Sequence, residues 1–229
     1  MSKFNDLFFP GGHKLGIERS RTTILLIRHG ECEGNREGLF RGRSDFPLND
    51  SGKLQARALA EAVSTLSPAR VFSGPLSRAT ETAQAVCDRC SIPLEIRQGF
   101  NNMALGKWEK RKKSDVEQEY PEEWRLWLSH PERLHISGAE TLSDVQRRSF
   151  ANLNALVNYH EGETFVVVSH RAVLKPLLAA ALGIGEPYFW RTHIDTASFS
   201  ILTHEKERGY CLVSLNQTSH LEHLISEWV

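Results

Sequence analysis

The sequence predicts an α/β protein: a three-layer sandwich with a mainly parallel central sheet, helices on both faces and a lid insertion. Short apolar segments typical of buried strands alternate along the chain with longer segments of helical periodicity. Histidine or arginine follows several of the apolar segments within a few residues. The alternation favours parallel strands covered by helices, and 229 residues fit a single domain of this class.

The first half of the chain supplies a regular series of elements. The run TILLI at residues 23–27 is expected to be a strand buried on both faces. A helix should follow Asn49, a capping residue, because apolar side chains recur at helical spacing through KLQARALAEAVSTL. The next expected elements are a strand at 70–73, a helix from 78 to about 90 and a strand at 94–97.

The second half resumes the alternation after an interruption. Residues 99–140 carry a basic run and three tryptophans without a clear period, and we expect them to form a lid, since long connections often cover sites. The expected division is therefore an N-terminal extension at 1–22 and one domain at 23–229. The remaining elements should be helices at 140–160 and 174–183 and strands at 163–169, 197–203 and 209–216.

Composition excludes several classes of function. The 28 basic and 28 acidic residues balance, so nothing favours a nucleic acid or membrane partner. No segment approaches the roughly 20 apolar residues of a membrane span, and residues 1–20 do not resemble a signal peptide. The four cysteines fit a reducing, cytoplasmic location. Cys87 and Cys90 form a C-x-x-C, which we interpret as the buried side of a helix. The oligomeric state is left open.

The residues that follow the strands suggest phosphate chemistry. Arg28 and His29 follow the first strand, Arg78 lies just after the second, and His170 follows the strand at 163–169. The carboxyl ends of parallel strands meet at one edge, where such sheets bind ligands. Arginine suits a phosphate group, and a neutral imidazole can attack phosphorus. Each residue alone is more often a solvated or capping residue; their coincidence favours a shared site.

Four ordered motifs carry a family resemblance. LLIRHGECEGN resembles the signature R-H-G-E-[TS]-x-x-N, and FRGRSDFPLNDSGKLQA resembles its following loop, with D-x-P-L and G-x-x-Q-A. SGPLSRATETA is similar to S-P-L-x-R-A-x-x-T-A, and VVVSHRAVLKPLLA to the segment around a second histidine. From about Thr23 to about Thr203 the chain thus resembles the histidine phosphatase superfamily, which includes cofactor-dependent phosphoglycerate mutases and many small phosphatases.

The resemblance implies roles for individual residues. It makes His29 the nucleophile that becomes phosphohistidine, while Arg28, Arg78 and His170 complete the catalytic phosphate site. Asn35 would add a neutral donor to the substrate, and Arg41 would reach the site from its loop, although a surface role fits Arg41 equally. The substrate would be a small phosphorylated metabolite. No metal or other cofactor is expected, because the arginines supply the positive charge.

One motif departs from the family. Its proton donor usually lies in L-R-E-x-x-x-G-x-W-E-G, and here that stretch reads FNNMALGKWEK. Gly106, Trp108 and Glu109 fix the register and place Asn102 at the position of the acid. A carboxamide has no proton to give at neutral pH, and general acid catalysis contributes typically ~10²–10⁴-fold. Transfer from an alkyl phosphate should therefore be slow, whereas an acidic phenol should leave with little help.

Several interpretations of Asn102 remain open at this point. The protein could be a slow phosphatase, Glu109 or Glu140 could have replaced the acid, or the site could bind a phosphorylated ligand without turnover; an engineered substitution is a fourth. We favour weakened hydrolysis, because electrostatic stabilisation usually outweighs one acid–base contribution.

Two further functions are alternatives to hydrolysis. The first is mutase-type phosphotransfer, for which residues 110–113 could hold a carboxylate, although a solvated helix start is the simpler interpretation of that basic run. The second is a non-catalytic phospholigand-binding module. The sequence does not identify the natural substrate.

Overall fold

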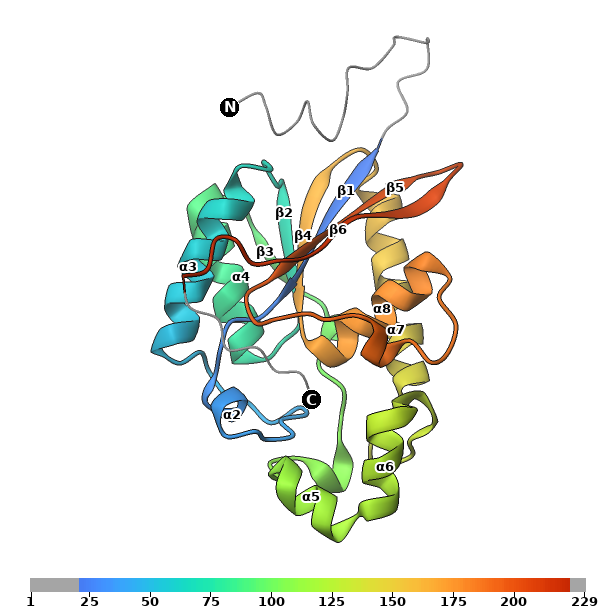
Figure 1. The fold of residues 1–229 in the computed structure, drawn as a ribbon. Coiled ribbons are helices and arrows are strands. Elements are labelled where there is room, and N and C mark those ends of the chain that lie inside the picture. The colour runs from blue at the N-terminus through green and yellow to red at the C-terminus, as the bar shows by residue number, and fades with distance from the viewer. Residues whose placement is uncertain (1–20, 223–229) are drawn as a thin grey trace.

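The computed structural model describes residues 21–222, so the expected extension at 1–22 lies almost entirely outside the described residues. The described chain forms a six-stranded sheet in the order β3-β2-β4-β1-β5-β6 (Figure 1). The four strands β3, β2, β4 and β1 are parallel, whereas β5 pairs antiparallel with β1 and β6 pairs antiparallel with β5. This confirms the predicted mainly parallel sheet. The strands are β1 (Thr22–Arg28), β2 (Arg70–Ser73), β3 (Leu94–Ile96), β4 (Thr164–Ser169), β5 (Phe199–Glu205) and β6 (Gly209–Gln217).

Helices cover both faces of this sheet (Figure 1). Alternate side chains of β1 point to opposite faces, as the twofold repeat of a strand requires. Ile24 and Leu26 belong to the apolar cluster formed with α7 (Leu142–Tyr159) and α8 (Arg171–Leu182). Leu25 and Ile27 belong to a second cluster, with α3 (Asp50–Ser64) and α4 (Ser77–Cys90). The predicted three-layer arrangement is therefore confirmed.

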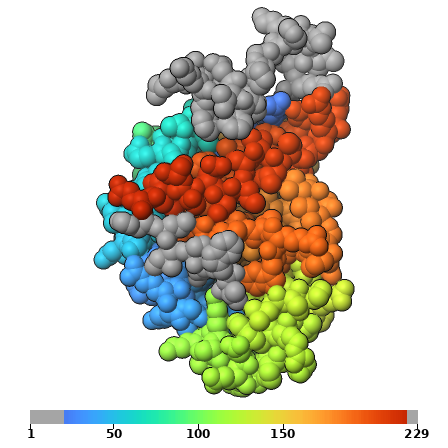
Figure 2. All heavy atoms as spheres, viewed as in Figure 1, coloured from blue at the N-terminus to red at the C-terminus, as the bar shows by residue number. Residues whose placement is uncertain are grey.

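Residues 99–140 contain helices that no clear apolar period in the sequence predicts. These are η2 (Gly106–Trp108), α5 (Lys113–Glu119), α6 (Pro121–Ser129) and η3 (Pro131–Arg133); η1 (Gln98–Phe100) precedes them. Trp108 and Trp127 lie in a third apolar cluster, which also includes Val145 of α7 and Val173 of α8. The segment extends beyond the carboxyl ends of the parallel strands, where it forms the green lower part of Figures 1 and 2.

Backbone pairing joins this segment to the loop after β1. That loop begins with the short helix α2 (Glu33–Arg36). Leu39 forms an antiparallel bridge with Lys112, and the amide of Phe40 donates to the carbonyl of Arg111 at 2.9 Å. The loop after β1 and the segment at 99–140 are thereby held together. They meet beyond the carboxyl ends of the parallel strands, the end of the sheet at which His29 and His170 lie.

The structure also bears on two expectations from composition. Cys87 is buried in α4, where burial raises the pKa of its thiol to about 11, and Cys90 is half-buried. Within residues 21–222 no helix is long and apolar enough to cross a membrane.

Candidate functional site

The two histidines lie together at the carboxyl ends of β1 and β4. Arg28 is the register partner of Ser169, and the amide of His29 donates to the Ser169 carbonyl at 3.0 Å. The His29 and His170 ring centroids are consequently 5.1 Å apart, with an interplanar angle of 57°. The sheet thus brings together side chains that are separated by most of the chain.

The imidazole of His29 is held in one tautomer. Its Nδ1 lies 2.7 Å from the carbonyl oxygen of Gly30, which can only accept, so Nδ1 carries the proton. Nε2 is left with a lone pair. Burial lowers the pKa of His29 well below 6.5, and the charges of Arg78, Arg28 and Arg41 lower it further. His29 is therefore a neutral imidazole at pH 7, with its nucleophilic nitrogen unprotonated.

No hydrogen bond from residues 21–222 holds the ring of His170. It is buried, and neither of its ring nitrogens has a hydrogen-bond partner in the described part of the chain. Burial, and next the charge of Arg78, lower the pKa of His170 well below 6.5. A buried polar group without a partner costs about 1–3 kcal/mol. Beside His29, this imidazole is suited to a ligand that supplies the missing contacts.

We expect both imidazoles to remain neutral when surface histidines protonate. In the ligand-free protein, the ring C–H resonances of His29 and His170 should not shift as pH falls through 6.5, because burial and arginine charges oppose protonation. An NMR titration, assigned with His29→Ala and His170→Ala, measures this. A midpoint near 6.5 for either ring would contradict the described environment.

The lowered pKa values of His29 and His170 determine how these residues make stability depend on pH. The folded-state pKa of each histidine lies below that of the unfolded chain, so the unfolded state takes up protons first. Their contribution to the free energy of unfolding is complete above pH 6.5 and declines as pH falls below that value.

Arg78 places a fixed positive charge beside the histidines. It lies in the first turn of α4 and is fully buried. Its Nη1 donates to the carbonyl of Ser44 and its Nη2 to that of Gly42, both at 3.0 Å. Burial, and then the charge of Arg41, lower the pKa of Arg78 to about 10, so the guanidinium is still charged at pH 7. Arg28 is anchored similarly, with Nη1 donating to the carbonyl of Ile194 at 2.8 Å.

Two buried side chains that the sequence interpretation did not single out position the loop after His29. The amide of Gly30 donates to Thr82 Oγ1 at 3.0 Å, and the amide of Glu31 donates to Gln55 Oε1 at 2.9 Å. Both belong to the quoted motifs, as the threonine of R-A-x-x-T-A and the glutamine of G-x-x-Q-A. Gly30 is needed for close approach, because a Cβ there would lie 2.7 Å from the carbonyl oxygen of Gly52.

Asn35 and Arg41 belong to the loop after β1. Asn35 Oδ1 accepts from the amide of Cys32 at 3.0 Å and from its thiol at 3.1 Å, so the oxygen is committed to the turn of α2. The charge of Arg41 contributes to the lowered pKa of His29 and of His170, so Arg41 is within electrostatic range of both rings.

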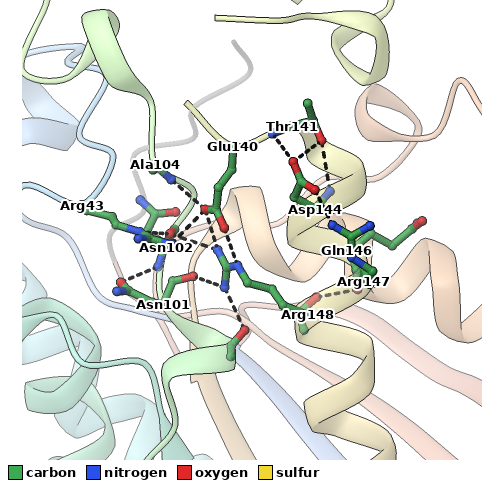
Figure 3. Close-up of polar contacts among 12 residues, drawn as sticks. Arg43, Asn101, Asn102, Ala104, Glu140, Thr141, Asp144, Gln146, Arg147 and Arg148 are labelled. Atoms are coloured by element: carbon green, nitrogen blue, oxygen red, sulfur yellow. Dashed lines mark hydrogen bonds and ion pairs between the residues drawn. The ribbon is translucent and has the colours of Figure 1, made fainter. Parts of the chain in front are cut away.

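Asn102 lies beside Arg78. Its Nδ2 donates at 2.7 Å to the Gly42 carbonyl, the oxygen that also accepts from Arg78 Nη2, and its buried Oδ1 has no partner in the described chain. Arginines hold its main chain: Arg43 Nε and Arg148 Nη2 donate to the Asn102 carbonyl at 3.2 and 3.1 Å (Figure 3). The residue at the expected acid position therefore borders Arg78, the expected phosphate ligand.

The neighbouring carboxylates are engaged elsewhere. Glu109 accepts from the amides of Arg43 and Leu105, both at 3.1 Å, and from Ser44 Oγ at 3.2 Å. Glu140 accepts from Arg148 Nε at 2.8 Å and pairs with Arg43 at 3.1 Å (Figure 3). Burial alone would raise the pKa of Glu140, but the Arg148 hydrogen bond, the amide of Ala104 and the arginine charges hold it below its ordinary value.

A comparison with family models decides the relationship. The model of the histidine phosphatase superfamily (branch 1) matches residues 24–218. The chain belongs to this superfamily. The match covers the whole sheet except the first residues of β1, together with every residue of the site described above.

Individual members of the superfamily are similar over most of their length. Phosphoserine phosphatase 1 of Hydrogenobacter thermophilus is 31% identical over 198 residues, covering 86% of this chain and 93% of that protein. A probable phosphoglycerate mutase of Salmonella choleraesuis is 26% identical over 204 residues, covering 87% and 94%. The structure of Bacillus stearothermophilus YhfR superposes with a TM-score of 0.82 at 28% identity, covering 87% of this chain and 98% of that one.

Proposed function

We propose that this histidine phosphatase superfamily member hydrolyses phosphomonoesters through a phosphohistidine on His29, and that Asn102 weakens the reaction. The observation that carries the proposal is the fixed tautomer of His29, a neutral imidazole beside arginine side chains. Its unprotonated Nε2 is the form that a nucleophile requires. The similarity to a protein named as a phosphatase supports the same activity.

The proposed reaction has two steps. In the first, His29 Nε2 forms a bond to phosphorus while the bond from phosphorus to the ester oxygen breaks, and the leaving group takes the electron pair. Arg28 and Arg78 bind the equatorial oxygens, where charge spreads, and His170 donates a hydrogen bond to a further phosphoryl oxygen. In the second step water attacks the phosphohistidine, releasing inorganic phosphate and restoring the neutral imidazole.

Within residues 21–222, the proposed reaction has no acid positioned to protonate the leaving group. Asn102 lies next to Arg78, and its amide can donate a hydrogen bond but not a proton. Glu109 and Glu140 are committed to contacts with the loop and with arginines. An alkoxide therefore departs without a positioned acid, and esters of acidic alcohols or phenols are the preferred substrates.

Water is the proposed acceptor of the phosphoryl group. A mutase would need a site for an organic acceptor, and the basic run at 110–113 does not supply one: Lys110 and Lys112 are exposed, and Arg111 pairs with Glu119. Phosphotransfer to an organic acceptor is the alternative reaction, because one relative is named as a probable phosphoglycerate mutase. A binding module without turnover is the alternative outside the enzymes.

Trapping the covalent intermediate tests the proposal. During turnover of p-nitrophenyl phosphate, quenching in alkali and peptide mass spectrometry should find phosphohistidine at His29. His29→Ala should lose both the label and hydrolysis, whereas His135→Ala, which changes an exposed histidine, should keep both. A chelator should have no effect, because arginines supply the charge. Label that persists in His29→Ala, or turnover without label, would refute the proposed route.

A further inference from the structure

Lys175 is a buried cation next to the site. It lies in α8, the helix that begins directly after His170, and only 2% of its surface is exposed. Its ammonium nitrogen lies 4.7 Å from the ring centroid of Phe189 and 4.8 Å from that of Trp190. The guanidinium carbon of Arg171 lies 5.8 Å from the same Trp190 ring. Two cations of one helix thus share an aromatic neighbour.

Within the described part of the chain, the contacts of the Lys175 ammonium are cation–π contacts with Phe189 and Trp190, and it has no carboxylate partner there. Lysines with so little exposed surface are usually paired with a carboxylate. Arg171 and Lys175 are like charges four residues apart on a helix, an arrangement that destabilises it. Burial lowers the pKa of Lys175 to about 7, and the neighbouring charges of Arg171 and Arg28 act in the same direction.

The position of Lys175 connects it to the phosphate-binding residues. Arg28, expected to bind the phosphate, is close enough for its charge to act on Lys175. Arg28 is anchored on the carbonyl of Ile194, in the segment that continues from η4 (Phe189–Arg191), whose rings contact the lysine. Lys175 is therefore within electrostatic range of Arg28, the expected phosphate ligand.

We propose that Lys175 binds a second anionic group of the substrate, a carboxylate or a second phosphate, next to the phosphoryl group on which His29 acts. This inference rests on the proposed function, because it places the transferred phosphoryl group at His29. An oxyanion there would give the buried ammonium its missing partner, with charge-assisted hydrogen bonds and no competing carboxylate. Phe189 and Trp190 would exclude water from the pair, which strengthens it.

Two inhibitors that differ in a single group test the proposal. 3-Phosphoglycerate carries a carboxylate where glycerol 3-phosphate carries a hydroxymethyl group. As competitive inhibitors of p-nitrophenyl phosphate hydrolysis, they should differ in inhibition constant by about tenfold or more in favour of the carboxylate. A glycerol bisphosphate serves as the second-phosphate probe. An inhibition constant measures binding and does not depend on proton donation to a leaving group. Asn102 therefore does not affect the comparison.

Lys175→Met removes the charge and keeps the length of the side chain. The preference for 3-phosphoglycerate or the bisphosphate should disappear, while p-nitrophenyl phosphate is hydrolysed with kcat/KM unchanged within about twofold. Thermal unfolding should occur at the same or a higher temperature, since an unpaired buried charge is lost. Lys53→Met, at an exposed lysine of α3, should change neither quantity.

Three outcomes would overturn the inference. They are equal inhibition constants in the unchanged protein, a preference that survives Lys175→Met, and a lower unfolding temperature with an unchanged preference, which would make Lys175 a structural cation. The two inhibition constants measured on the unchanged protein test the inference even if Lys175→Met does not fold. Absence of any p-nitrophenyl phosphate hydrolysis would instead refute the proposed function, so the two failures are distinguishable.

Discussion

Asn102→Glu should accelerate the hydrolysis of alkyl phosphates by ~10²–10⁴-fold, the usual contribution of a general acid. Hydrolysis of p-nitrophenyl phosphate should change far less, because its leaving group needs little protonation. Rates for glycerol phosphate and p-nitrophenyl phosphate in the same preparations measure the selectivity. Asn102→Gln, which lengthens the side chain equally without an acid, is the matched control and should accelerate neither.

The structure explains why a carboxyl group introduced at this position should act as an acid. The Asn102 carbonyl is fixed by Arg43 and Arg148, so the main chain that carries the new side chain is already held (Figure 3). The side chain faces the carbonyl of Gly42, which can only accept and therefore favours a protonated carboxyl group, while the neighbouring charge of Arg78 favours the carboxylate. Burial, like the Gly42 carbonyl, disfavours the carboxylate.

Other results would be equally informative. If both substrates accelerate, the change acts on binding or folding rather than on proton transfer. If neither accelerates, Glu109→Gln and Glu140→Gln locate the group that already donates. A selective collapse of alkyl phosphate hydrolysis in one of them would identify that group and contradict the unassisted reaction proposed above.

Arg78→Lys should lower kcat/KM for alkyl and aryl phosphates alike by ~10²–10³-fold, comparable to the loss of one oxyanion-stabilising donor. Lysine keeps the charge but cannot reproduce a fork that holds two carbonyls and still faces a phosphate. Arg89→Lys, an exposed position of the same helix, should leave kcat/KM unchanged. A loss of less than about threefold in Arg78→Lys would mean that Arg78 is not a phosphate ligand.

The strands were predictable because buried parallel strands are short apolar runs with few alternatives. The clearest case is the run at residues 163–169, which forms β4 (Thr164–Ser169) as expected. The order of the strands was harder to predict. The three-residue connection between β5 and β6 is too short for a parallel crossover and indicates that these two strands pair antiparallel. Nothing in β5 indicates its antiparallel pairing with β1, which joins residues far apart in sequence.

Residues 99–140 show where periodicity fails. The α6 helix (Pro121–Ser129) buries Trp127 among aromatic residues from several elements, while its Leu126 and Leu128 are exposed. A helix that packs on a small cluster shows only a weak apolar stripe. Its existence depends on the tertiary contacts more than on local pattern.

Part of the site also had no signal in the sequence. Both histidines follow strands and were identified from that placement, whereas Arg43 and Arg148 act on the main-chain carbonyl of Asn102. Contacts with carbonyl groups do not depend on the identity of the residue contacted, so no motif at Asn102 points to these arginines. Only the folded arrangement shows them.

Gly42 has no reactive group, yet its carbonyl oxygen accepts from both Arg78 and Asn102. The residue has a φ of +52°, which favours glycine, and a Cβ there would displace the side chain of Glu109. Mutational effects at positions 78 and 102 should therefore be non-additive, since each change alters the partner of the other through one shared oxygen. Along an evolutionary lineage this coupling is epistasis: an acid at 102 is gained or lost in a background that Arg78 has already constrained.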